Sequence, residues 1–160
     1  MKKHKATLIG VGMILLALII VLSAVLIPRI VQKNKMKEHL AKMMAEDVQI
    51  MIVEDPLFMK WDLLGNNGTE VVLEGEQFLD IRAKLQAMID GGYRVDYDEK
   101  RDTGAWDMNL RVRTATGESL RLWIDEATFY MMEDTFALGF CPKDEAAYAA
   151  LREAMIAVLQ

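Results

Sequence analysis

The pattern of hydrophobic and polar positions divides the chain into two parts. Residues 6–27 form an apolar run of 22 positions without a charge, whereas the remainder mixes apolar and charged residues as a globular domain does. A helix of that length is roughly 33 Å long, which is enough to cross the hydrocarbon core of a bilayer. The run therefore predicts a transmembrane anchor at 6–27. Pro28 is expected to close the span, because a proline disfavours helical geometry in the residue before it.

An amphipathic pattern follows the apolar run. Met36, Leu40, Met43 and Met44 recur at helical spacing with lysines between them. This predicts a juxtamembrane stalk over residues 28–46. The stalk either lies on a surface or self-associates, or it continues as a solvated helix that packs on the following domain.

In residues 47–160, apolar and polar positions alternate with the period of strands in several segments, and two other segments have the period of amphipathic helices. The helices are expected at 76–90, with a stop at Gly91-Gly92, and at 144–159. A turn at 65–68 suggests a hairpin, and 134–140 fits no element clearly. Strands are expected at 48–54, 70–73, 93–97, 106–112, 120–124 and 129–132. The chain is therefore expected to be α+β, with an N-terminal transmembrane helix followed by a small antiparallel sheet that has amphipathic helices packed on one face.

Charge separates the same two parts. Residues 1–42 carry eight basic side chains and one acidic one, a net charge of +7. The remaining 11 basic and 23 acidic side chains give residues 43–160 a net charge of −12. An acidic domain repels phosphate backbones, so no nucleic-acid partner is expected. The basic flanks of the anchor suit anionic headgroups, which makes the lipid bilayer an expected partner.

The amino-terminal tail suggests an orientation in the cell membrane. Residues 1–5 hold three lysines, which is typical of a signal anchor whose amino end stays in the cytoplasm. The domain at 47–160 is then extracytoplasmic. A cut after Ser23 would leave four apolar residues on the mature end, so the anchor is expected to stay uncleaved.

The domain is poor in the residues of common catalytic sites. The two histidines of the chain, His4 and His39, both lie beside the membrane segment, so the sequence of the domain at 47–160 holds none. This disfavours histidine-dependent triads and the common zinc patterns. Cys141 is the single cysteine and is expected to be a buried or half-buried thiol. Phosphate-binding glycine motifs are missing from the sequence. We therefore expect a protein that is not an enzyme and has no cofactor and no metal.

An acidic segment at 96–107 partly matches the pattern of the calcium-binding loop. Asp96, Asp98 and Asp102 occupy the first, third and seventh positions of such a loop. Lys100 and Arg101 place positive charge where a ligand and a glycine are required. A solvated hairpin is therefore the expected structure of this segment.

Strand alternation suggests one interaction patch. Trp123 points away from the side of Leu122 and Ile124, so it is a candidate for exposure. Tryptophan and arginine are frequent interface anchors. The candidate patch consists of Trp123, Arg121, Arg111 and Arg113. The alternative is cross-strand packing of the tryptophan beneath a helix.

These observations lead to an expected function with two alternatives. The first hypothesis is a single-pass membrane protein whose domain binds a protein or envelope ligand. The second is a structural subunit, because Thr7-Leu8-Ile9 and Pro28 resemble the type IV pilin and pseudopilin class, in which an amino-terminal hydrophobic helix joins an antiparallel sheet. Lys5, Ala6 and Gly10 depart from that class at its diagnostic positions, so no family is assigned. The third is a carboxylate-dependent hydrolase, for which the sequence singles out no pair of acids.

Overall fold

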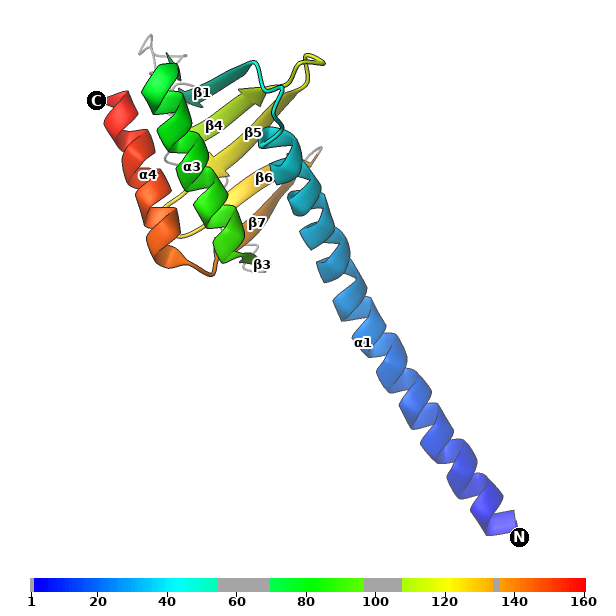
Figure 1. The fold of residues 1–160 in the computed structure, drawn as a ribbon. Helices are drawn as coiled ribbons and strands as arrows, with labels where there is room; N and C mark the ends of the chain where they lie inside the picture. Colours follow the sequence, from blue (N-terminus) through cyan, green and yellow to red (C-terminus); the bar gives the residue numbers. More distant parts are fainter. Residues whose placement is uncertain (1, 55–69, 97–107, 134–135) are drawn as a thin grey trace, which may run out of the picture. The chain divides into compact units, whose positions relative to one another are not determined.

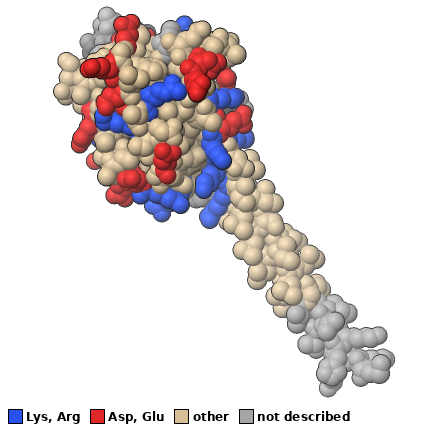
Figure 2. Space-filling model, viewed as in Figure 1, with Lys and Arg blue, Asp and Glu red and all other residues tan. Residues whose placement is uncertain are grey.

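The computed structural model describes residues 2–54, 70–96, 108–133 and 136–160, and the chain divides into two compact units, 1–35 and 36–160. In the first unit, the helix α1 (Lys2–Met43) carries the apolar run. The large apolar side chains from Met13 to Val31 are 46–68% exposed. Among the described residues, one stretch, Gly12–Met43, is helical, long and apolar enough to cross a membrane by length and composition. Figure 2 shows uncharged surface over the described residues of the apolar run.

Pro28 does not end the helix, so the expected stop at this residue was wrong. Helix α1 continues through the proline to Met43. A proline inside a helix removes one backbone hydrogen bond and introduces a steric clash, which weakens a helix without always terminating it. Helix-forming residues on both sides can carry the helix past this local cost.

The second unit contains one antiparallel sheet of seven strands in the order β2-β1-β4-β5-β6-β7-β3 (Figure 1). This sheet and its helices confirm the predicted α+β class. Of the segment 134–140, which the pattern left open, residues 136–140 belong to strand β7, and residues 134–135 lie outside the described residues. The strands are β1 (Ile50–Glu54), β2 (Glu70–Val72), β3 (Tyr93–Val95), β4 (Met108–Arg113), β5 (Ser119–Ile124), β6 (Phe129–Glu133) and β7 (Phe136–Pro142).

Helices α3 (Gly75–Gly91) and α4 (Glu145–Leu159) lie side by side over one face of the sheet (Figure 1). Helix α3 ends where expected, because Gly92 takes a left-handed φ of 78° that a side chain would disfavour. The side chain of Asp144 accepts a hydrogen bond from the amide of Ala147 and so caps α4. Helix α3 connects β2 at one edge of the sheet with β3 at the other.

The end of α1 belongs to the core of the second unit. Met36, Leu40 and Met43 are at most 1% exposed and join the hydrophobic cluster of the sheet and helices. The compact unit therefore begins at Met36, ahead of the boundary at 47 that the pattern predicted. Arg82 of α3 donates to the carbonyl oxygens of Met44 and Ala45 at 2.8 and 3.1 Å, which satisfies backbone groups just past the helix end.

Several sequence predictions lie outside the described residues. These are the hairpin turn at 65–68, the indole of Trp106 and the acidic segment from residue 98 to residue 107.

Candidate functional site

The four residues of the predicted patch lie on neighbouring strands and on one face of the sheet. Arg111 of β4 stands directly opposite Arg121 of β5. Arg113 on β4 and Trp123 on β5 lie two positions away from this pair, on its two opposite sides. Leu110 and Leu122 alternate with them and point into the core on the other face. The period of two therefore brings the four residues together, as the sequence pattern indicated.

Two carboxylates that sequence reasoning missed pair with two of the three arginines of this patch. Arg111 Nε lies 3.0 Å from Glu54 Oε1, and Arg111 Nη2 lies 2.9 Å from Glu70 Oε1. Arg121 Nε lies 3.7 Å from Glu54 Oε2. Glu54 and Glu70 come from β1 and β2, and their register against β4 is set by strand pairing that no local pattern reveals. Arg111 and Arg121 therefore belong to an ion-pair network between strands.

Trp123 is a packed residue. It is 7% exposed, and the guanidinium of Arg121 lies 5.9 Å from the centre of its ring. Asn109, which pairs with it across the ladder, is also buried. Trp123 is therefore packed across the strands, which was one of the two arrangements that the strand pattern allowed. Of the four predicted residues, only Arg113 is exposed.

A groove at the junction of β7 and α4 offers a different candidate site. Its volume is about 410 Å³, which falls within the range of small-ligand sites. One wall is a face of α4, and the others come from β3, the end of β7 and the turn between β5 and β6. The lining residues are Arg94, Glu126, Ala127, Cys141, Pro142, Glu145, Tyr148, Ala149, Arg152 and Glu153.

Tyr148 gives this groove a fixed shape. Its hydroxyl lies 2.9 Å from the carbonyl oxygen of Asp125 and 2.6 Å from that of Thr128, and its single proton is donated to this pair. Burial raises the pKa of Tyr148 well above its ordinary value, so the phenol stays protonated and neutral. The turn is closed further by the bond from the Asp125 amide to the Thr128 carbonyl oxygen. Helix α4 and this turn are therefore held together before any ligand arrives.

The groove combines charges of both signs. Arg94 and Arg152 can donate paired hydrogen bonds to a carboxylate, whereas Glu126, Glu145 and Glu153 can accept from an ammonium group. Cys141, which sequence reasoning described as a half-buried thiol, is the partner of Arg94 across the β3–β7 ladder and is partly exposed here. Sequence reasoning missed the groove because its residues come from four separate segments. Within the described ranges, no group of three or more histidine, cysteine or acidic side chains could hold a metal ion.

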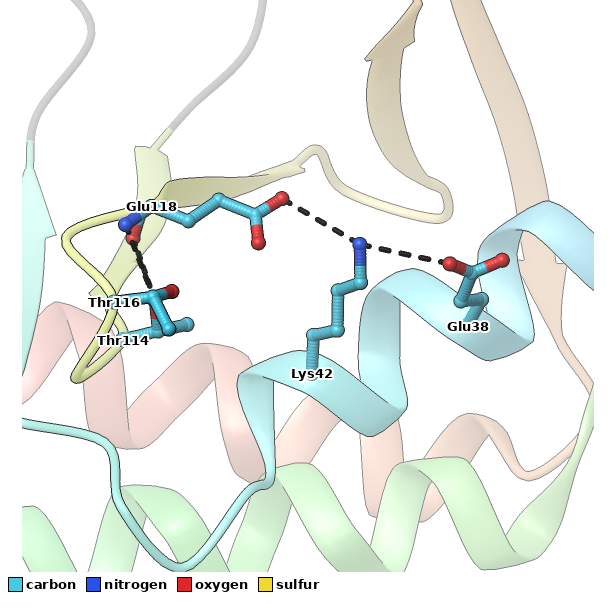
Figure 3. Close-up of polar contacts among 5 residues, drawn as sticks. All are labelled: Glu38, Lys42, Thr114, Thr116 and Glu118. Carbon is cyan, nitrogen blue, oxygen red and sulfur yellow. Dashed lines mark hydrogen bonds and ion pairs between the residues drawn. The ribbon is translucent and has the colours of Figure 1, made fainter.

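A third polar cluster joins the end of α1 to the β4–β5 hairpin (Figure 3). Lys42 Nζ lies 3.5 Å from Glu118 Oε1 and 3.5 Å from Glu38 Oε1. Glu118 ends a tight turn in which its amide and carbonyl both contact the side chain of Thr114. Beside this cluster, His39 Nε2 donates to the carbonyl oxygen of Arg121 at 2.8 Å.

Folding of the domain should become weaker below neutral pH because of His39. Burial lowers the pKa of His39, and Lys42 acts in the same direction, while the Arg121 carbonyl and Glu118 oppose the shift. The unfolded chain, with an imidazole pKa of about 6.5, therefore takes up this proton before the folded chain does. The stability that the neutral His39 contributes is complete above about pH 6.5, and it is lost as the pH falls toward the lower pKa of His39 in the folded chain.

Urea unfolding at pH 7.5 and 5.5 measures this loss. In His39→Gln the imidazole contribution is removed and an N–H donor is kept, so the difference between the two pH values should shrink. An equal difference in both proteins would contradict the prediction.

In comparisons with known proteins, no family model, no curated protein and no solved structure matches the chain.

Proposed function

We propose that this chain is a single-pass membrane protein whose acidic domain acts as a non-enzymatic binding module on the extracytoplasmic side. In this proposal α1 is the anchor, and the groove between β7 and α4 receives part of a protein or envelope ligand. The observation that carries the proposal is the preformed groove, which is held by Tyr148 and lined by both arginine and glutamate.

The exposure of α1 supports the membrane anchor. Large apolar side chains from Met13 to Val31 leave 46–68% of their area without protein cover, and exposing such a surface to water would be costly. A bilayer removes that cost, because its hydrocarbon core is itself apolar. The helical backbone is also suited to lipid, since it satisfies its own hydrogen bonds there. The basic residues on both sides of the run suit anionic headgroups.

The tail at residues 1–5 supports the orientation. Its three lysines favour a cytoplasmic amino end, which leaves the carboxy-terminal domain outside. Eight residues, 28–35, separate the apolar run from Met36, the first residue of the compact unit. The proposed ligand is therefore one that comes close to the membrane surface, such as a membrane-attached protein or an envelope polymer.

The charges in the groove indicate the chemistry of the ligand. A ligand with one carboxylate and one ammonium group, as in a peptide segment or its ends, matches the arginines and the glutamates together. A ligand of one sign would face repulsion from part of the lining.

Site-specific photo-crosslinking in intact cells tests this function. The photoreactive residue p-benzoylphenylalanine replaces Ala149, which lines the groove, or, as the control, the exposed Ala83 on α3. We expect an adduct from position 149, none from position 83, and loss of the adduct in Arg94→Glu. The matched variant Arg113→Glu, which changes another exposed strand arginine, should keep it. External protease should remove a carboxy-terminal tag from the same cells.

Two results would contradict the proposal. Adducts that form equally at positions 149 and 83, or that persist in Arg94→Glu, would show that the groove is not the binding site. A tag protected until the cells are permeabilised would place the domain in the cytoplasm.

A pilin-like structural subunit is the second candidate, and one observation favours it. A single helix, α1, carries the apolar run and ends with Met36, Leu40 and Met43 in the core of an antiparallel sheet domain. This continuity is the arrangement that the resemblance implies. A ladder of crosslinked copies of this chain in the same experiment would favour this candidate over the first.

A further inference from the structure

The pairing between β5 and β6 stops early. Strands β4 and β5 form six residue pairs and β6 and β7 form five, but β5 and β6 form two, Trp123 with Tyr130 and Ile124 with Phe129. Both strands continue past these pairs, because β5 begins at Ser119 and β6 extends to Glu133. We call the unpaired stretch between these two strands the seam.

The register shows which groups would meet if the seam closed. The next pairs would be Leu122 with Met131 and Arg121 with Met132. The Asp125 amide donates to the Thr128 carbonyl oxygen, so β5 residues 125, 123 and 121 direct their backbone groups toward β6. In a closed seam, the carbonyl oxygen of Arg121 would therefore accept from the backbone amide of Met132.

That carbonyl oxygen already has another donor. His39 Nε2 lies 2.8 Å from it, and this ring belongs to the last two turns of α1. The same turns are held by the buried side chains of Met36 and Leu40 and by the pair of Lys42 with Glu118. His39, at the end of α1, thus occupies a carbonyl oxygen of β5 that would otherwise accept a hydrogen bond from β6.

We propose that the end of α1 and strand β6 compete for this edge of β5, which makes the seam a two-state element. When the imidazole of His39 is docked on β5, it donates to the Arg121 carbonyl oxygen and the seam is open. When the imidazole turns away while Met36, Leu40 and Met43 stay in the core, the amide of Met132 donates to that carbonyl oxygen and the two strands pair further. A discrete choice between two arrangements is how packed structures pass a change from one element to another.

The seam also borders the candidate groove. Strands β5 and β6 are joined by the turn at 125–128, and Glu126 and Ala127 of this turn line the groove. Release of the Arg121 carbonyl oxygen by His39 would therefore change the ladder that supports one wall of the groove. This link to ligand binding rests on the proposed function, whereas the competition for Arg121 does not.

Hydrogen exchange of the Met132 amide tests the competition in the full chain reconstituted in lipid nanodiscs. In His39→Ala the carbonyl of Arg121 is released, so the Met132 amide should exchange more slowly than in the wild type, on the order of tenfold for one added hydrogen bond. His39→Gln keeps a side-chain N–H and should stay near the wild-type rate. The amide of Leu110 in the β4–β5 ladder serves as the reference and should not change.

A second variant tests the seam without touching the ring. Lys42→Glu turns the attraction to Glu118 into repulsion, and it changes a side chain that is 46% exposed, so the fold should persist. Slower exchange at Met132 is again expected. The proposal is overturned if the Met132 amide exchanges at the wild-type rate, or faster, in both His39→Ala and Lys42→Glu while Leu110 stays protected.

Discussion

A fragment of residues 47–160 should fail to fold cooperatively, whereas a fragment of residues 33–160 should fold. The shorter fragment lacks Met36, Leu40 and Met43, which are at most 1% exposed in the core. Removing a buried leucine or methionine side chain costs about 2–5 kcal/mol each, and a whole domain is stable by only about 5–15 kcal/mol. The loss of three such side chains, about 6–15 kcal/mol in total, is therefore as large as the whole stability of a typical domain. The longer fragment starts at Lys33 and keeps a helical turn ahead of Met36.

Urea unfolding followed by circular dichroism distinguishes the two fragments. Single substitutions in the longer fragment then locate the effect: Leu40→Ala should lower the free energy of unfolding by about 2–5 kcal/mol. Lys37→Ala, on the exposed side of the same helix, should change it by less than about 0.5 kcal/mol. A fragment of 47–160 with the same urea midpoint as 33–160 would show that the end of α1 is not part of the folding unit.

Trp123→Ala should lower the free energy of unfolding by about 3–5 kcal/mol, the usual cost of removing a large buried aromatic side chain. The indole is 7% exposed and packs beneath the guanidinium of Arg121. Arg113→Ala, four pairs along the same two-stranded ladder from the Trp123 position, changes an exposed side chain and should cost less than about 0.5 kcal/mol. Thermal or urea unfolding of the purified chain measures both values.

This comparison also decides how a loss of binding in Trp123→Ala would be interpreted. If the variant is destabilised as expected, lost binding reflects a disturbed domain and not a lost contact. Equal stabilities for Trp123→Ala and Arg113→Ala would mean that the tryptophan is free to act as a surface anchor, as the sequence pattern alone allowed.

The local elements were predictable because they depend on periodicity. Met108, Leu110 and Val112 alternate with polar residues, and the structure buries all three on the core face of β4. Helix α3 stops just before Gly92, where a positive φ suits glycine. These features arise from interactions within a few residues, so one segment contains the information needed to infer them.

The candidate sites depend on contacts between distant segments. Glu54 meets Arg111 because β1 pairs with β4, and this register joins residues more than fifty positions apart. The groove likewise combines Arg94 with residues of α4. Strand order and register are decided by the whole sheet, so charges that a linear pattern presents as an exposed basic patch become neutralised pairs.

The residues alone determined that this chain has an apolar segment long enough to span a bilayer, followed by an acidic domain of alternating strands and amphipathic helices. Composition and period suffice for this, because both reflect how each residue partitions between water and an apolar phase. Tertiary structure decided that the domain begins at Met36, that Trp123 is packed and that His39 occupies the edge of β5. These outcomes required long-range pairing, since burial and hydrogen bonding of a side chain depend on which distant surface comes to cover it.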